Sequence, residues 1–152
     1  MAAIPLSWND PMFNGVTNSG SVILRDGGAI SNKSITNTGD LASVVGYGSF
    51  TVDGVRIDSG EGVRIGGSGD IKINNSYIET KGVYHSDGIQ AYDPGGTGNV
   101  TVTNTTIVSE NDNTTAGMFV ADDYNGTFTF NNVVFKGGPF GLRIHADDKD
   151  LS

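Results

Sequence analysis

The chain has 152 residues, enough for one domain, and its hydrophobic fraction of 36% with 23 glycines favours a thin all-β core over a helical bundle. It contains no cysteine, so hydrophobic packing and turn chemistry must stabilise it without disulfides. The net charge of −8 argues against nucleic acid and anionic membranes as partners, because both attract basic surfaces.

Residues 1–20 show no strand periodicity and contain two prolines. We expect them to form an irregular lead-in or cap. They lack the charged region and apolar run of a signal peptide, and the chain has no apolar segment of 18 residues. The protein is therefore either cytoplasmic or exported by a leader outside this sequence.

From residue 21 to residue 152 a phrase recurs about every 25 residues: an alternating strand, a polar turn, a second strand with an asparagine, and a glycine. Such a period indicates a solenoid. Each repeat is too long for a hairpin and too short for a helical crossover, so equivalent strands must be parallel. The pattern predicts an all-β, right-handed parallel β-helix of about six coils. The first strands are predicted at residues 22–25, 43–47, 63–66, 89–92, 118–121 and 142–145.

Alternation within these strands places apolar side chains inward. The inward set is Val63, Ile65, Ile89, Ala91, Met118, Val120, Leu142 and Ile144. The second strands align one asparagine per coil at Asn32, Asn75, Asn104 and Asn132, with Gly54 on one rung. We interpret this ladder as structural, because stacked amides satisfy backbone groups at a tight corner. The same alignment predicts an inward stack of Ile35, Ile57, Ile78, Ile107 and Phe135.

The sequence stops shortly after a first strand, at Leu151 and Ser152, without a segment that could cover the last coil. Solenoids normally carry terminal caps. We therefore expect either a fragment of a longer β-helix or another domain or subunit against this uncapped end.

The outward positions of the first strands form a strip, because neighbouring coils lie about 4.8 Å apart. These positions hold Arg64, Gln90, Phe119 and Arg143, and two residues further on Gly66, Tyr92, Ala121 and His145. Aromatic rings and bidentate donors are typical of sugar-binding grooves. The alternative is an ordinary solvated face.

Acidic residues border this strip on both sides. Glu61 and Asp87 each precede a repeat glycine in adjacent coils, so their backbones should lie about 5 Å apart. Paired carboxylates at about 5–5.5 Å serve retaining glycosidases, although any solenoid with acids on successive coils gives this spacing. On the other side, Asp93 aligns with Asp122, and Asp123 with Asp147. These four aspartates are candidate Ca²⁺ ligands, and simple turn chemistry is the alternative.

The two histidines, His85 and His145, map to the same side of the solenoid. Neither has a second histidine or a cysteine at an aligned position, which disfavours zinc. Acid–base chemistry or hydrogen bonding to a substrate remains open for both.

The segment from Gly48 to Asp148 resembles the right-handed parallel β-helix proteins of the pectate-lyase-like superfamily over about two thirds of the chain. The most specific match is HSDGIQ at residues 85–90, similar to the H-x-DGIQ phrase of secreted bacterial members. The resemblance implies an extracellular protein that handles polysaccharides, with lyase or hydrolase activity. Phage tailspikes share the fold, which makes a virion component the alternative location.

HSDGI is also similar to the N-T-D-G-I phrase of polygalacturonases, whose catalytic aspartate would correspond to Asp87. The paired aspartates of that family are replaced here by Thr115 and Ala116, so its inverting mechanism is not carried over. Relatives that are lyases use Ca²⁺ to neutralise a uronate and an arginine or lysine to remove a proton. Arg143, aligned beside Asp122, could be that base, and Arg64 is the weaker candidate.

The leading hypothesis is a polysaccharide lyase or glycoside hydrolase, monomeric, with its substrate over the first sheet. Its catalytic candidates are Asp87, Asp122, Arg143 and His145, and its substrate-binding candidates are Arg64, His85, Gln90, Tyr92 and Phe119. The rival is a non-catalytic carbohydrate-binding or structural module, trimeric if it resembles a tailspike. Ice binding is disfavoured, because the pairs Thr101–Thr103 and Thr127–Thr129 do not recur in every coil.

Overall fold

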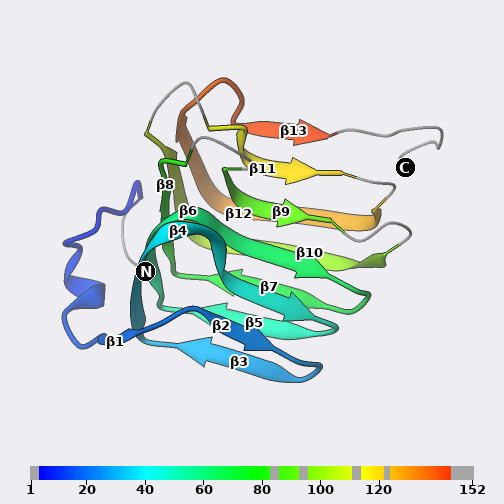
Figure 1. The fold of residues 1–152 in the computed structure, drawn as a ribbon, viewed down its shortest axis with the longest axis horizontal. Helices are drawn as coiled ribbons and strands as arrows, with labels where there is room; N and C mark the ends of the chain where they lie inside the picture. Colours follow the sequence, from blue (N-terminus) through cyan, green and yellow to red (C-terminus); the bar gives the residue numbers. More distant parts are fainter. Residues whose placement is uncertain (1–3, 83–85, 93–95, 111–113, 122–123, 145–152) are drawn as a thin grey trace.

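The computed structural model is a parallel β-helix, described for residues 4–82, 86–92, 96–110, 114–121 and 124–144 (Figure 1). One short 3-10 helix, η1 (Pro11–Phe13), precedes the strands. The strands are β1 (Thr17–Ser19), β2 (Val22–Leu24), β3 (Gly28–Ser31), β4 (Lys33–Tyr47), β5 (Phe50–Asp53), β6 (Arg56–Gly66), β7 (Ile71–Asn74), β8 (Tyr77–Thr80), β9 (Asp87–Ala91), β10 (Thr97–Ser109), β11 (Ala116–Val120), β12 (Asn125–Gly137) and β13 (Leu142–Ile144). Within the described residues no helix is long and apolar enough to cross a membrane.

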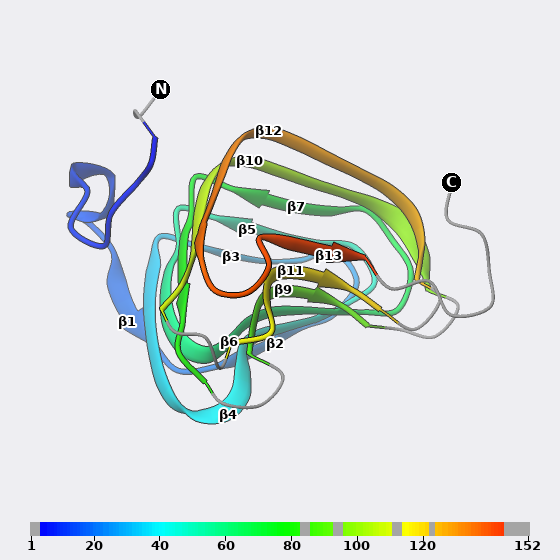
Figure 2. The same cartoon turned by 90° about the horizontal axis from the view of Figure 1, so that it is seen from above.

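The strands stack into three walls, which Figure 2 shows in a view along the solenoid. The first wall contains β2, the ends of β4 and β6, and then β9, β11 and β13. The second wall contains β3, β5, β7 and the beginnings of β10 and β12. The third wall contains β1, the beginnings of β4 and β6, β8, and the ends of β10 and β12. The long strands therefore bend across a corner from one wall to the next.

The register of the first wall confirms the predicted alignment of the coils. One inward row runs through Val22, Val44, Val63, Ile89, Met118 and Leu142, each paired with the next in parallel strands. Because a shift of one residue would turn every side chain to the opposite face, this register fixes which residues are inside.

The core fills the space between the walls, as the alternation predicts. Val63, Ile65 and Ile89 are fully buried, and so are Ile35, Ile57, Ile78 and Ile107 of the third wall. Leu142 and Ile144 differ from the expectation, because they are 41% and 52% exposed. They belong to β13, the last strand of the described stack, so only β11 packs beside them.

The asparagine ladder is confirmed at the corner between the second and third walls. Asn75, Asn104 and Asn132 have φ angles of 50°, 49° and 58°, the left-handed conformation that asparagine tolerates better than most residues. The Asn132 side-chain amide donates to Asn104 Oδ1 at 2.8 Å, and the Asn104 amide donates to Asn75 Oδ1 at 3.3 Å. Gly54, with a φ of 66°, provides the same backbone without a side chain.

The repeat glycine is explained differently: the next coil approaches it so closely that a side chain would not fit. A Cβ atom on Gly88 would lie 2.5 Å from the carbonyl oxygen of Gly117, and one on Gly117 would lie 2.6 Å from that of Gly141. Part of the obstacle is backbone, which cannot move aside as a flexible side chain would. The coils that enter the first wall at Gly62, Gly88 and Gly117 therefore need a glycine there, whereas the register places Ser43 at this position of β4.

The N-terminal segment lies on the outside of the third wall (Figure 2). The backbone amide of Leu6 donates to Thr106 Oγ1 at 2.7 Å, and the Trp8 ring meets the Tyr77 ring edge-on at 6.3 Å between centroids. The Arg56 guanidinium lies 4.5 Å from the Trp8 ring centroid and donates to the Trp8 carbonyl at 2.9 Å. Residues of the predicted lead-in thus contact three strands of one wall.

Candidate functional site

The outer surface of the first wall brings four predicted site residues into one row. Arg64 pairs with Gln90, Gln90 with Phe119, and Phe119 with Arg143 in successive parallel strands. The row continues in the other direction through Val45. The members differ in depth: Arg143 is exposed and Phe119 half-buried, whereas Gln90 is only 4% exposed. Gln90 therefore departs from the expected solvent-facing role, and its Oε1 finds no hydrogen-bond donor among the described residues.

Arg64 is held by a carboxylate from its own strand. Its Nε and Nη2 donate to Glu61 Oε1 and Oε2 at 2.9 and 2.7 Å, and Glu61 is 1% exposed. These hydrogen bonds raise the pKa of Arg64, against a smaller lowering by burial. Sequence reasoning assigned Glu61 to a carboxylate pair with Asp87 and missed this ion pair, although the spacing of three residues was available as a signal.

Arginine guanidinium groups lie against aromatic rings at several points along the first wall. The guanidinium carbon of Arg64 lies 5.8 Å from the Tyr92 ring centroid, and that of Arg25 lies 5.0 Å from the Tyr47 centroid. The guanidinium carbon of Arg143 lies 5.2 Å from the Phe119 ring centroid and 5.3 Å from the Phe140 ring centroid. Such contacts hold both partners in place. Tyr47 was missed from the sequence, although it occupies the Tyr92 position in an earlier coil.

Two adjoining hollows lie over the first wall. One of about 260 Å³ is lined by Val45, Tyr47, Arg64, Gly66, Gly67 and Tyr92. The other, of about 300 Å³, is lined by Ser21, Val22, Ile23, Ala42, Val45, Tyr47 and Arg64. Because they share Val45, Tyr47 and Arg64, we treat them as one groove and call it the Tyr47–Tyr92 groove. The Tyr47 ring lies over Gly66, since a Cβ there would lie 3.0 Å from Tyr47 Cε1.

Asp87 lies at the start of β9 and is fully buried. Burial, and then the charge of Glu61, raise the pKa of Asp87 to about 7, against the lowering effects of the Ala116 amide and of Arg64 and Arg143. The Ala116 amide is close enough to lower this pKa, yet neither Asp87 oxygen meets a donor at hydrogen-bonding geometry among the described residues. A carboxyl group with such a pKa can hold a proton near neutral pH and donate it.

The remaining sequence candidates lie outside the described residues: His85, Asp93, Asp122, Asp123, His145 and Asp147. The predicted Ca²⁺ ligands all belong to this group. Within the described part of the chain, no three His, Cys, Asp or Glu side chains are grouped so that they could hold a metal ion.

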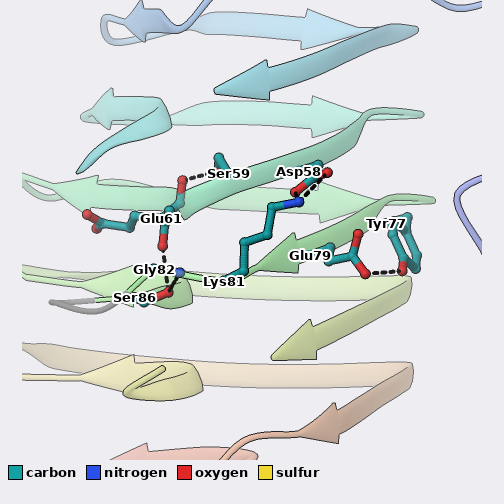
Figure 3. Close-up of polar contacts among 9 residues, drawn as sticks. Asp58, Ser59, Glu61, Tyr77, Glu79, Lys81, Gly82 and Ser86 are labelled. Carbon is teal, nitrogen blue, oxygen red and sulfur yellow. Dashed lines mark hydrogen bonds and ion pairs between the residues drawn. The ribbon is translucent and has the colours of Figure 1, made fainter. Parts of the chain in front are cut away.

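A second group of ionisable residues lies on the third wall (Figure 3). The Tyr77 hydroxyl donates to Glu79 Oε1 at 3.2 Å, and Lys81 Nζ lies 2.9 Å from Asp58 Oδ1. Burial, followed by a hydrogen bond and charge repulsion with Glu110, raises the pKa of Glu79 to about 7. This group packs near the N-terminal segment, because Tyr77 also contacts Trp8. It contributes no side chain to the Tyr47–Tyr92 groove.

Comparison with known proteins agrees with this architecture. A family model described as a right-handed β-helix region matches residues 11–152. No curated protein matches the chain, and neither does any solved structure. The match confirms the predicted all-β, right-handed parallel solenoid.

Proposed function

Because the chain belongs to the right-handed β-helix family, whose members often act on carbohydrates, we propose that it binds a polysaccharide across the first wall. The observation that carries the proposal is the Tyr47–Tyr92 groove, in which Arg64 is fixed between Glu61 and Tyr92. Tyr47 and Tyr92 are 44% and 45% exposed, so their rings are available to a ligand.

The chemistry of these groups suits a sugar chain. Exposed aromatic rings offer apolar faces to the C–H groups of a pyranose. Glu61 uses two of the five N–H groups of the Arg64 guanidinium, and the other three are of a kind that can donate to ligand hydroxyl groups. Because the ion pair fixes the guanidinium before binding, little side-chain entropy is lost when the ligand arrives. A polysaccharide ligand also fits an extracellular or virion location.

The test is direct binding to a panel of neutral and acidic polysaccharides, measured by calorimetry and affinity electrophoresis. We expect at least one to bind, and Tyr92→Ala and Tyr47→Ala to weaken that binding about tenfold or more. Lys136→Ala, an exposed change on β12 that lines neither hollow, should bind like the wild type. Absence of binding across the panel would overturn the proposal.

Catalysis by the same surface is a second candidate, and the state of Asp87 favours it. A carboxyl group protonated near neutral pH, close to the charges of Glu61, Arg64 and Arg143, suits the general acid of a hydrolase or lyase. Under this proposal Arg143 and His145 are further catalytic groups, and Asp93, Asp122, Asp123 and Asp147 hold Ca²⁺.

Turnover is tested by absorbance at about 235 nm for unsaturated products and by reducing ends for hydrolysis. Asp87→Asn should abolish product formation and keep polysaccharide binding. Binding without turnover by the wild type would leave a non-catalytic module. Mass measurement in solution then separates a monomer from the trimer expected of a tailspike-like shaft.

A further inference from the structure

We propose that the sugar segment bound in the Tyr47–Tyr92 groove is uncharged. This inference rests on the proposed polysaccharide binding and specifies its ligand. Its basis is the charge of the groove: among the described residues that line it, Arg64 is the only ionised side chain, and a buried carboxylate already neutralises it.

The ion pair weakens anion recognition by Arg64. Glu61 occupies the Nε and Nη2 edge, one of the two guanidinium edges that can bind a carboxylate or sulfate bidentately. An anionic ligand could use only the Nη1 and Nη2 edge without displacing Glu61, and it would meet a guanidinium whose charge the buried Glu61 carboxylate already offsets. A hydroxyl group needs only a single donor and does not depend on the charge of the guanidinium.

The surrounding charges act in the same direction. Asp87, whose pKa responds to the charges of both Glu61 and Arg64, is a second buried carboxyl group near the ion pair and brings no positive charge to it. Arg25 contacts the Tyr47 ring but lines neither hollow. With a net charge of −8, the chain as a whole repels polyanions.

Apart from Ser21 and the hydroxyl groups of Tyr47 and Tyr92, the rest of the lining is apolar or lacks a side chain. Ile23 is 62% exposed, and Val45 lies beside it in the next strand. Tyr47 and Tyr92 are separated by the strand that carries Gly66, a spacing of about 9.6 Å for two coil steps. The Tyr47 ring lies over Gly66, so the two tyrosines and the aliphatic side chains offer a ligand apolar contacts and hydroxyl groups.

The experiment compares oligosaccharides of the same linkage that differ in the charge of the sugar, such as fragments of β-1,4-mannan and of β-1,4-mannuronan. Dissociation constants are measured by calorimetry at two salt concentrations, with EDTA and with added Ca²⁺. We expect a neutral member to bind at least tenfold more tightly than its uronate counterpart, with little dependence on salt. Tighter binding of a uronate in either buffer would overturn the inference and leave the proposed function standing. Binding of neither class would overturn both.

A charge variant provides the second readout. Glu61→Gln keeps the side-chain volume and removes the neutralising charge, so the uronate-to-neutral affinity ratio should rise at least fivefold. Glu110→Gln makes the same change of charge away from the groove and should leave the ratio unchanged. An unchanged ratio in folded Glu61→Gln protein would contradict the inference. If the Glu61→Gln variant does not fold, the uronate-to-neutral affinity ratio of the wild-type protein tests the inference.

Discussion

The guanidinium group of Arg64 donates two hydrogen bonds to the buried carboxylate of Glu61, at 2.9 and 2.7 Å, from three residues further along β6. Arg64 lines the groove and Glu61 is buried, so the pair links the groove surface to the packed interior. Its removal should therefore affect stability as well as binding.

Replacing Arg64 by Met should lower the free energy of unfolding by about 2–3 kcal/mol, because the buried Glu61 carboxylate would lose the counter-charge and the two hydrogen bonds of Arg64. The partial exposure of the Arg64 side chain, 37%, places the cost below that of a fully buried pair. Adding Glu61→Gln should recover part of the loss. Urea denaturation of both single variants and of the double variant measures the coupling energy between Arg64 and Glu61. If the losses of unfolding free energy in the two single variants add up to the loss in the double variant, the two residues are not coupled and the prediction is wrong.

Gly88→Ala should lower the free energy of unfolding by about 2–4 kcal/mol, since its Cβ would meet the Gly117 carbonyl oxygen at 2.5 Å. Gly20 offers the matched control, because a Cβ there would have no neighbour within 4 Å. Gly20→Ala should change stability by about 0.5 kcal/mol or less. Equal urea midpoints for the two variants would refute the close-approach explanation of the repeat glycine.

Asn104→Ala should cost more than Asn104→Gly, by about 1 kcal/mol. Both variants lose the side-chain hydrogen bonds to Asn75 and Asn132. Only alanine also has to adopt the φ of 49° with a Cβ atom that disfavours it. Thermal and urea unfolding measure the difference, and a glycine variant as unstable as the alanine variant would show that the backbone conformation contributes little.

Asp87→Asn should make the protein more stable at pH 8, by about 1–4 kcal/mol, and leave its stability near pH 3 almost unchanged. The native pKa of Asp87 is raised to about 7, so the folded state binds this proton more tightly than the unfolded chain does. Stability from this group is full below the unfolded pKa of about 4 and declines up to about pH 7.

The measurement for Asp87 is the difference between wild-type and variant unfolding free energies across this pH range. Taking the difference removes the contribution of Glu79, whose pKa is also raised to about 7. A difference that does not change with pH would contradict the raised pKa of Asp87.

The repeat predicted most of the fold, because in a parallel stack each position has the same neighbours in every coil. The inward rows, the asparagine corner and the third-wall isoleucine stack are therefore confirmed where neighbouring coils lie on both sides. Leu142 and Ile144 show the limit, since alternation gives the direction of a side chain and says nothing about what covers it.

The site was less predictable, for physical reasons that particular residues illustrate. The outward position of Gln90 was correct, but its depth depends on the packing of its neighbours. The Glu61–Arg64 pair forms between two non-equivalent positions of one coil, which comparison between coils does not reveal. Tyr47 could have been found by extending the row of Tyr92 back to an earlier coil.

The N-terminal segment gives the solenoid a connection that repeats alone lack. Its partners Arg56, Tyr77 and Thr106 stand in register in β6, β8 and β10, so one short stretch spans three successive coils. In a simple stack each unit senses only its nearest neighbours and can fray independently. Here, separation of any of these three coils also disturbs the contacts of the N-terminal segment with the other two. Local opening is therefore more cooperative along the axis.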